Sequence, residues 1–157
     1  MNDNGLFSAG NAIVVAVTLV AVTIAVVIHH EALNALYRRL PTLGRRPRRR
    51  MFLLSGAILA VHTVEIWLFA AAYWILLAPL ELGGWAGKAP PDMFNLIYFS
   101  AAAYTTAGWG DVVVEGPVRI LAGMESLLGL VLITWSASFT FWELKRSWDG
   151  KDRDERT

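Results

Sequence analysis

Residues 104–112 read YTTAGWGDV, and this stretch decides how the whole chain is arranged. Two threonines lead into two glycines that stand on either side of a tryptophan, and an aspartate follows them. The stretch lies between two long apolar segments, at residues 51–77 and 118–142. A glycine-rich loop cannot lie against lipid, because its backbone N–H and C=O groups would have no partners there. The loop must therefore be enclosed by protein or line a water-filled path.

The composition is that of a small integral membrane protein. The chain has 157 residues, of which 55% are hydrophobic, and its mean hydropathy is +0.46. Ordinary soluble domains are less apolar than this. Cysteine is absent, which excludes disulfides, cysteine-based metal sites and thiol catalysis. The length allows one domain with a few spanning helices.

Three apolar segments are long enough to cross a membrane, at residues 12–28, 51–77 and 118–142. The first covers about 26 Å as a helix, against a hydrocarbon core of roughly 30 Å. All three are predicted to be helices, because a single strand could not satisfy its backbone in lipid. The residues before the first segment include no Lys or Arg, so we interpret it as a retained anchor rather than a signal peptide.

The basic residues predict the orientation. Twelve of the fourteen fall in the first connection or after the third segment, and only Lys88 and Arg119 lie on the other side. The positive-inside rule then puts the N-terminus outside and the C-terminus in the cytoplasm. An Arg-rich loop between two spanning helices is a topology signal more often than a nucleic-acid site, and we expect residues 45–50 to meet anionic lipid headgroups.

The outer connection, at residues 78–117, is too apolar to be a simple loop. Its first part, LELGGWAGKAPP, is predicted to be a turn-rich turret. Pro90 and Pro91 then lead to Asp92, a favourable N-cap for a helix over DMFNLIYFSAAAYTT. This helix is apolar but too short to span. A short buried helix, a glycine-containing loop and a full spanning helix together describe a re-entrant hairpin.

The glycines suggest what the loop does. Gly108 and Gly110 alternate with other residues, and glycine takes positive φ at little cost. Alternating handedness lets successive carbonyls point the same way, with the hydroxyls of Thr105 and Thr106 at the inner end. Such a column of oxygen dipoles can replace the water around a cation, and the C-terminal end of the short helix favours a cation below it. One strand cannot surround an ion, so symmetric copies are required.

The motif TTAGWGD resembles the potassium-channel signature TTVGYGD. The resemblance extends over residues 51–145: NLIYFSAAAYTTAGWGD is similar to a pore helix with its filter, and RILAGMESLLGLVLITWSASFTF to an inner helix. It implies an all-α membrane protein with three transmembrane helices, a re-entrant pore helix and a filter loop, assembled as a tetramer. The first helix is extra, as in small bacterial pore-only members of the family.

The family's roles can be carried over by position. The resemblance implies that the filter carbonyls belong to Thr106, Ala107, Gly108, Trp109 and Gly110. K⁺ would bind at the first four of these carbonyls. It places the Thr106 hydroxyl at the innermost site and Asp111 at the outer mouth. Gly129 stands where the family often has a hinge glycine. Ile133 and Ala137 would line the inner cavity, and Phe141 would narrow the cytoplasmic exit and gate by dewetting.

Two positions depart from the family pattern. Ala107 stands where valine is usual, and Trp109 where tyrosine is usual; both side chains should face away from the ions. The first change removes bulk behind the filter and the second adds it. Potassium selectivity is the favoured interpretation, and a weakly selective cation pore is the alternative. A non-conducting membrane scaffold or subunit with the same fold is a third hypothesis.

Ionisable residues inside the spans form a further hypothesis. His62 and Glu65 share one face of the second segment, and Glu125 lies at a comparable depth in the third. They are either a proton-sensitive group that modulates the filter or a polar cluster that supports the pore helix. His29 and His30 are adjacent and point to different helix faces, near the expected inner interface, so a haem or metal site is not predicted there.

The prediction is therefore a homotetrameric, pore-only cation channel of a bacterial cytoplasmic membrane. It is not an enzyme, and its only small ligand is permeant K⁺; its partners are copies of itself and membrane lipids, without nucleic acid or a small-molecule substrate. The expected regions are an N-terminal helix with its amphipathic end and Arg-rich loop (1–50), a pore domain (51–146) and a short cytoplasmic tail (147–157). The pore domain divides into an outer helix (51–79), turret (80–91), pore helix (92–105), filter (106–111) and inner helix (117–146).

Overall fold

Three long helices, one short helix and a two-stranded antiparallel sheet, called the hairpin below, make up the fold. The computed structural model of the chain describes residues 8–39 and 47–154, and describes side chains only as far as residue 146. The long helices are α1 (Ala9–Arg39), α2 (Pro47–Leu77) and α4 (Arg119–Asp154). Between α2 and α4 come β1 (Gly84–Gly87), α3 (Met93–Tyr104), β2 (Val112–Glu115) and the 3₁₀ turn η2 (Gly116–Val118).

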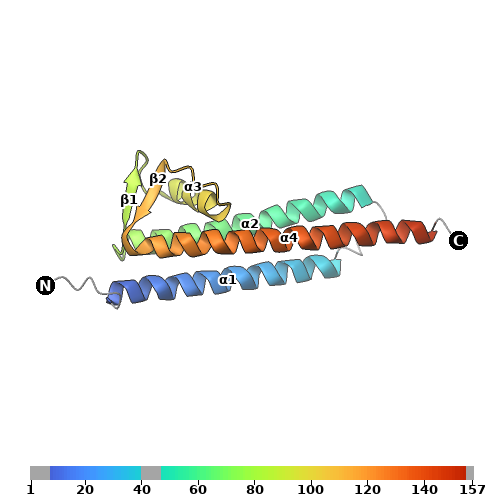
Figure 1. The fold of residues 1–157 in the computed structure, drawn as a ribbon, viewed down its shortest axis with the longest axis horizontal. Coiled ribbons are helices and arrows are strands. Elements are labelled where there is room, and N and C mark those ends of the chain that lie inside the picture. Colours follow the sequence, from blue (N-terminus) through green and yellow to red (C-terminus); the bar gives the residue numbers. More distant parts are fainter. Residues whose placement is uncertain (1–7, 40–46, 155–157) are drawn as a thin grey trace.

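The long helices lie side by side along the molecule, and the hairpin and α3 sit at one end of them (Figure 1). Each of the three contains a window apolar enough to cross a membrane, within Ala9–Arg39, Arg48–Leu77 and Gly116–Arg146. The outward faces carry many exposed large apolar side chains, as expected of surfaces that meet lipid or a partner. The predicted multi-pass membrane protein with three spanning helices is confirmed.

Helix α1 packs on α2 and α4 through a narrow stripe. Its buried residues recur every three or four positions, at Val14, Thr18, Ala21, Ala25, His29 and Leu33. This spacing keeps them on one helix face. The middle of the stripe consists of Thr18, Ala21 and Ala25, and small residues let neighbouring helices approach closely in a membrane.

Two helix boundaries correct the predicted connections. Helix α2 begins at Pro47, so Arg48, Arg49 and Arg50 of the predicted Arg-rich loop are helical, while α1 ends at Arg39. Proline at the first helical position is favourable, since its missing N–H would be unpaired there anyway. At the other end α4 continues to Asp154, through most of the predicted tail. Arg45 and Arg46 lie outside the described residues.

A strand of the turret pairs with a strand after the loop, in a small sheet that was not predicted from the sequence. Strands β1 and β2 are antiparallel and pair Gly84 with Glu115 and Gly87 with Val112. Three consecutive valines in β2 favour a strand. Gly87 is needed because a Cβ there would lie 2.8 Å from the Asp111 carbonyl oxygen. The sheet therefore ties the segment that precedes α3 to the segment that follows the loop.

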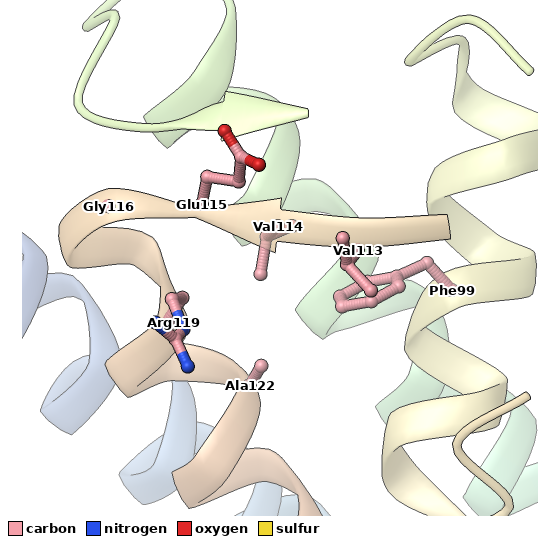
Figure 2. Close-up of a pocket in the computed structure, with 7 residues that line it drawn as sticks. All are labelled: Phe99, Val113, Val114, Glu115, Gly116, Arg119 and Ala122. Atoms are coloured by element: carbon pink, nitrogen blue, oxygen red, sulfur yellow. The ribbon is translucent and has the colours of Figure 1, made fainter. Parts of the chain in front are cut away.

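A pocket of roughly 570 Å³ lies where the hairpin meets α3 and α4. Phe99 of α3 faces Val113 of β2 across it, and Arg119 comes from the first turn of α4 (Figure 2). The Phe99 ring also contacts Trp85 of β1 and Tyr73 of α2, with ring centres 5.8 and 5.1 Å apart. Phe99 thus joins the hairpin, α3 and α2.

The short helix α3 begins as the sequence predicts. The side chain of Asp92 accepts a hydrogen bond from the Asn95 backbone N–H at 2.9 Å. Leu96, Ser100 and Tyr104 form its buried face at a spacing of four residues. Twelve residues of helix measure about 18 Å, too short to cross a membrane. The predicted mostly helical fold with a short, pore-like helix is confirmed.

Gly129 of α4 permits the closest contact between α4 and α3. A Cβ at this position would lie 2.1 Å from the Tyr104 carbonyl oxygen and 2.9 Å from its carbon. No rotamer change relieves a clash with backbone, so α3 or α4 would have to move. Gly129 was predicted as a hinge in the inner helix; in the structure it lies within the continuous helix α4, where it makes room for the end of α3.

We predict that Gly129→Ala destabilises the protein, although alanine is the better helix former. Overpacking a close contact typically costs about 1–3 kcal/mol, more than the roughly 1 kcal/mol gained in helix propensity. The matched control is Gly123→Ala in the same helix, where an added Cβ meets no atom within 4 Å. Thermal unfolding in detergent, followed by circular dichroism, should show a lower Tm for Gly129→Ala alone. Equal Tm values for the two variants would contradict the packing argument.

Candidate functional site

The loop after α3 has an alternating backbone. Positive φ values occur at Thr106 (58°), Gly108 (54°) and Gly110 (76°), which are every second residue. The two glycines were predicted to adopt this conformation. Thr106 was not, because a β-branched residue rarely takes positive φ and no sequence signal marks it. Alternation of handedness is the backbone pattern that a column of parallel carbonyls requires.

The start of this loop is bonded to the end of α3. The N–H of Thr105 donates to the carbonyl of Ala101, that of Thr106 to Ala103, and that of Gly108 to Ala102, at 3.0–3.2 Å. These carbonyls belong to the last turn of α3 and would otherwise lack helical partners. The Thr105 hydroxyl also donates to the Ala101 carbonyl, at 2.7 Å. The Thr105 hydroxyl is therefore engaged with the helix, whereas the Thr106 side chain is exposed.

The far end of the loop is held by Tyr98 of α3. Its hydroxyl donates to Asp111 Oδ2 at 3.0 Å, and its ring meets the Trp109 ring edge-on with centres 6.4 Å apart. Partial desolvation, with the hydrogen bond and negative charge of Asp111, raises the pKa of Tyr98 above its ordinary value. The hydroxyl therefore keeps its proton and continues to donate at neutral pH. Tyr98 was missed in the sequence, where only its position on α3 could have indicated it.

An apolar groove of roughly 800 Å³ runs between α2 and α4 from the start of the loop. Three of the predicted cavity residues, Ile133, Ala137 and Phe141, line this groove together with Thr105. The structure thus brings these three residues together along α4. Gly129 is not among the residues that line the groove; it contacts Tyr104 instead.

Glu65 of α2 is the centre of a buried polar cluster. Its Oε1 lies 2.9 Å from Nδ1 of His29, and its Oε2 lies 3.0 Å from Nδ1 of His62. The Tyr104 hydroxyl, at the end of α3, donates to Oε2 at 2.5 Å. Ser136 Oγ of α4 lies 3.3 Å from Nε2 of His29. All four helices therefore contribute to one network around a fully buried carboxylate.

Glu125 of α4 is the centre of a second buried cluster. Ser100 of α3 donates to its Oε1 at 2.5 Å, and Tyr73 of α2 donates to its Oε2 at 2.6 Å. The Ser100 hydroxyl also lies 2.8 Å from the Ile66 carbonyl of α2. This cluster joins the middle of α3 to the two helices on either side of it.

The structure corrects the predicted group of His62, Glu65 and Glu125. His62 and Glu65 are together, but Glu125 belongs to the second cluster. The reason lies in α3, because Ser100 and Tyr104 are one turn apart and each reaches a different carboxylate. Hydropathy and depth place buried carboxyl groups but do not show which hydroxyl each one meets.

The position of His29 is a further correction. It was expected near the inner interface, but it is fully buried against Glu65. The cause is the length of α1, which continues ten residues beyond His29 to Arg39. His30, its neighbour in sequence, is exposed on another face as predicted.

An ion pair joins α2 to α4 in the half of the molecule that lies away from the hairpin. Arg50 of α2 bonds to the buried carboxylate of Glu143 on α4, and Arg146 Nη1 lies 3.9 Å from the other oxygen. Arg50 and its neighbours were expected to meet lipid headgroups. In the structure Arg50 is instead paired with Glu143 of α4. Glu143 had not been singled out in the sequence.

Comparison with known proteins gives one match. A family model described as "Ion channel" matches residues 53–144, which is more than half of the chain and includes most of α2, all of α3, the loop and most of α4. No curated protein and no solved structure matches the chain.

We predict that Ser100→Ala destabilises the protein by about 1–3 kcal/mol, because Glu125 would lose a donor inside the protein. Ser138→Ala is the control, since Ser138 is exposed and its hydroxyl bonds only to its own helix, at Thr134. Chemical or thermal unfolding in detergent measures the difference. A Ser100→Ala variant as stable as Ser138→Ala would show that Glu125 does not fasten α3.

Proposed function

Because the chain belongs to the ion channel family whose model it matches, we propose that it is a homotetrameric, potassium-selective channel. It is a membrane channel protein and not an enzyme. The observation that carries the finer proposal is the alternation of positive φ at Thr106, Gly108 and Gly110, directly after a re-entrant helix. Ions would pass by exchanging their water for the carbonyl oxygens of Thr106, Ala107, Gly108 and Trp109, in several successive sites.

The proposed tetramer follows from the way in which a single loop presents its oxygens. A single loop of this kind offers oxygens to an ion from one side only, so several loops must meet around an axis. The groove lined by Ile133, Ala137 and Phe141 supports this arrangement, because its apolar wall is open in the single chain. In a tetramer these residues would line the cavity below the filter, with Phe141 at its narrow end.

The environment of Trp109 bears on selectivity. Its ring meets Tyr98 of α3, which supports a side chain that packs behind the filter rather than toward the ions. The Tyr98 hydroxyl holds Asp111 at the outer mouth. Together they supply support behind the filter that the small Ala107 does not. A weakly selective cation pore is the second candidate, favoured by the small side chain of Ala107.

The charge distribution supports the predicted orientation. Lys88 follows β1 and Arg119 begins α4, at the hairpin end (Figure 1). The other basic residues with described side chains lie at the end of α1, the start of α2 or the last third of α4, toward the opposite end: Arg38, Arg39, Arg48, Arg49, Arg50, Lys145 and Arg146. By the positive-inside rule the hairpin and filter mouth face outward and the C-terminus faces the cytoplasm of a bacterial cell.

The test is the reversal potential of purified protein in planar bilayers under opposed K⁺ and Na⁺ gradients. We predict a reversal close to the K⁺ equilibrium potential. A reversal near zero would favour the weakly selective pore, and absence of current would favour a non-conducting scaffold.

A backbone variant controls for contaminating channels. Gly108→Ala should abolish or strongly reduce the current, because an L-residue with a Cβ resists the positive φ of this position by about 1–2 kcal/mol. Gly123→Ala, in open space on α4, should conduct as the natural chain does.

Glu125 makes pH modulation part of the proposal. Its carboxylate accepts hydrogen bonds from Ser100 and Tyr73, and it also interacts electrostatically with Tyr104 of the Glu65 cluster. Protonation would replace one acceptor with a donor and so weaken the hold on α3. Current should therefore fall as the solution is made acidic.

The corresponding prediction concerns Glu125→Gln. Glutamine has nearly the same shape and does not titrate, so the acid-induced fall in current should flatten relative to the natural chain. Bilayer recordings at a series of pH values measure it, with Glu115→Gln on the exposed hairpin as the control. Identical pH–current curves for the natural chain and Glu125→Gln would contradict this role.

A further inference from the structure

The buried cluster around Glu65 has the composition of a metal site. His29, His62 and Glu65 each offer one ligand atom, and these atoms all lie within 4.8 Å of one another. We propose that they bind a divalent transition-metal ion, with Zn²⁺ as the best fit. Two imidazole nitrogens and one carboxylate oxygen are a ligand set that zinc uses in proteins, and they also suit other divalent metals of the first transition row.

The geometry needs only a small adjustment. Tetrahedral zinc at 2.0–2.1 Å from its ligands holds neighbouring ligand atoms about 3.3 Å apart. Nδ1 of His29 lies 2.9 Å from Oε1 of Glu65, Nδ1 of His62 lies 3.0 Å from Oε2, and the three ligand atoms lie within 4.8 Å of one another. Small rotations of these side chains would open the space at their centre. The ligands come from α1 and α2, so the ion would link the first helix to the second.

A fourth ligand and an outer contact are already in place. The Tyr104 hydroxyl lies 2.8 Å from Nδ1 of His62 and 2.5 Å from Glu65, where it can complete a tetrahedron. Ser136 Oγ lies beside Nε2 of His29. Metal-binding histidines commonly have a hydrogen-bond partner on the ring nitrogen that does not bind the metal, and this partner fixes the ring orientation.

Charge also favours a cation here. Glu65 is fully buried inside the helical bundle, and its partners are two histidines and a tyrosine. Among the described residues no Lys or Arg forms an ion pair with it. A buried carboxylate within a membrane requires compensation, and a divalent ion bound between Glu65 and the histidines would supply it.

The site has a route of entry. His62 is only partly buried and lines the groove between α2 and α4, together with Tyr104 and Ser136. An ion could therefore reach the ligands from the groove without opening the contact between α1 and α2. Once bound, it would fix Tyr104, the residue directly before the loop. Binding itself does not depend on conduction, so the site can be tested in protein that passes no current.

The experiment uses the full chain, purified in detergent and freed of metal with a chelator. Zn²⁺ binding is measured by equilibrium dialysis and elemental analysis, and Co²⁺ is added as a spectroscopic substitute. We expect about one Zn²⁺ per chain and the intense visible bands of four-coordinate Co²⁺. His29→Ala, His62→Ala and Glu65→Gln should each lose stoichiometric binding. Ser136→Ala should weaken it by about tenfold, the lower range for an outer-shell partner.

His30→Ala is the matched control, because His30 is next to His29 in sequence but exposed and outside the cluster. It should bind Zn²⁺ as the natural chain does. Circular dichroism and gel filtration establish that each variant is folded. The proposal is overturned if the natural chain binds no more Zn²⁺ than Glu65→Gln. It is also overturned if Co²⁺ shows only the spectrum of the free aqueous ion, since the cluster would then be a hydrogen-bonded network only.

Discussion

The structure depends on how one irregular loop satisfies its backbone at membrane depth. The answer lies in the last turn of α3, whose carbonyls accept the N–H groups of Thr105, Thr106 and Gly108. Two problems are thereby solved together, because a helix end and a glycine-rich loop both have unpaired backbone groups. The cost is that the loop can be no more stable than the placement of α3. The remaining contacts of the short helix are best understood as means of keeping it in place.

Two buried carboxylates hold α3 in place through hydrogen bonds. Glu125 reaches Ser100 in the middle of α3, and Glu65 reaches Tyr104 at its end. The two α3 residues lie one turn apart on the same face, so the helix is fixed against both rotation and sliding. A hydrophobic face alone would allow such movements, because apolar contacts have little directional preference. Gly129 contributes by shape, since only a residue without a Cβ admits the Tyr104 backbone so close to α4.

Much of this fold could be predicted from the sequence, because the signals are physical and local. Hydropathy gave the three spans, and Asp92 gave the start of α3. The positive φ of Gly108 and Gly110 followed from glycine itself. What escaped prediction depends on contacts between distant segments. Thr106 shares the unusual backbone only because its neighbours impose it. The partners of Glu65 and Glu125 are set by helix rotation, which sequence periodicity does not fix when all faces of a helix are apolar.

By its position in the sequence, the first helix looks like an addition to a complete pore module. The family match begins at residue 53 and leaves α1 outside. Yet His29 of α1 lies against Glu65, and Glu65 in turn accepts a hydrogen bond from the hydroxyl of Tyr104, directly before the loop that follows α3. A chain that lacked α1 would expose one oxygen of this carboxylate to lipid with no partner, at high energetic cost. The first helix is therefore part of the structure that positions the loop, and Glu65 is where the added helix and the pore module meet.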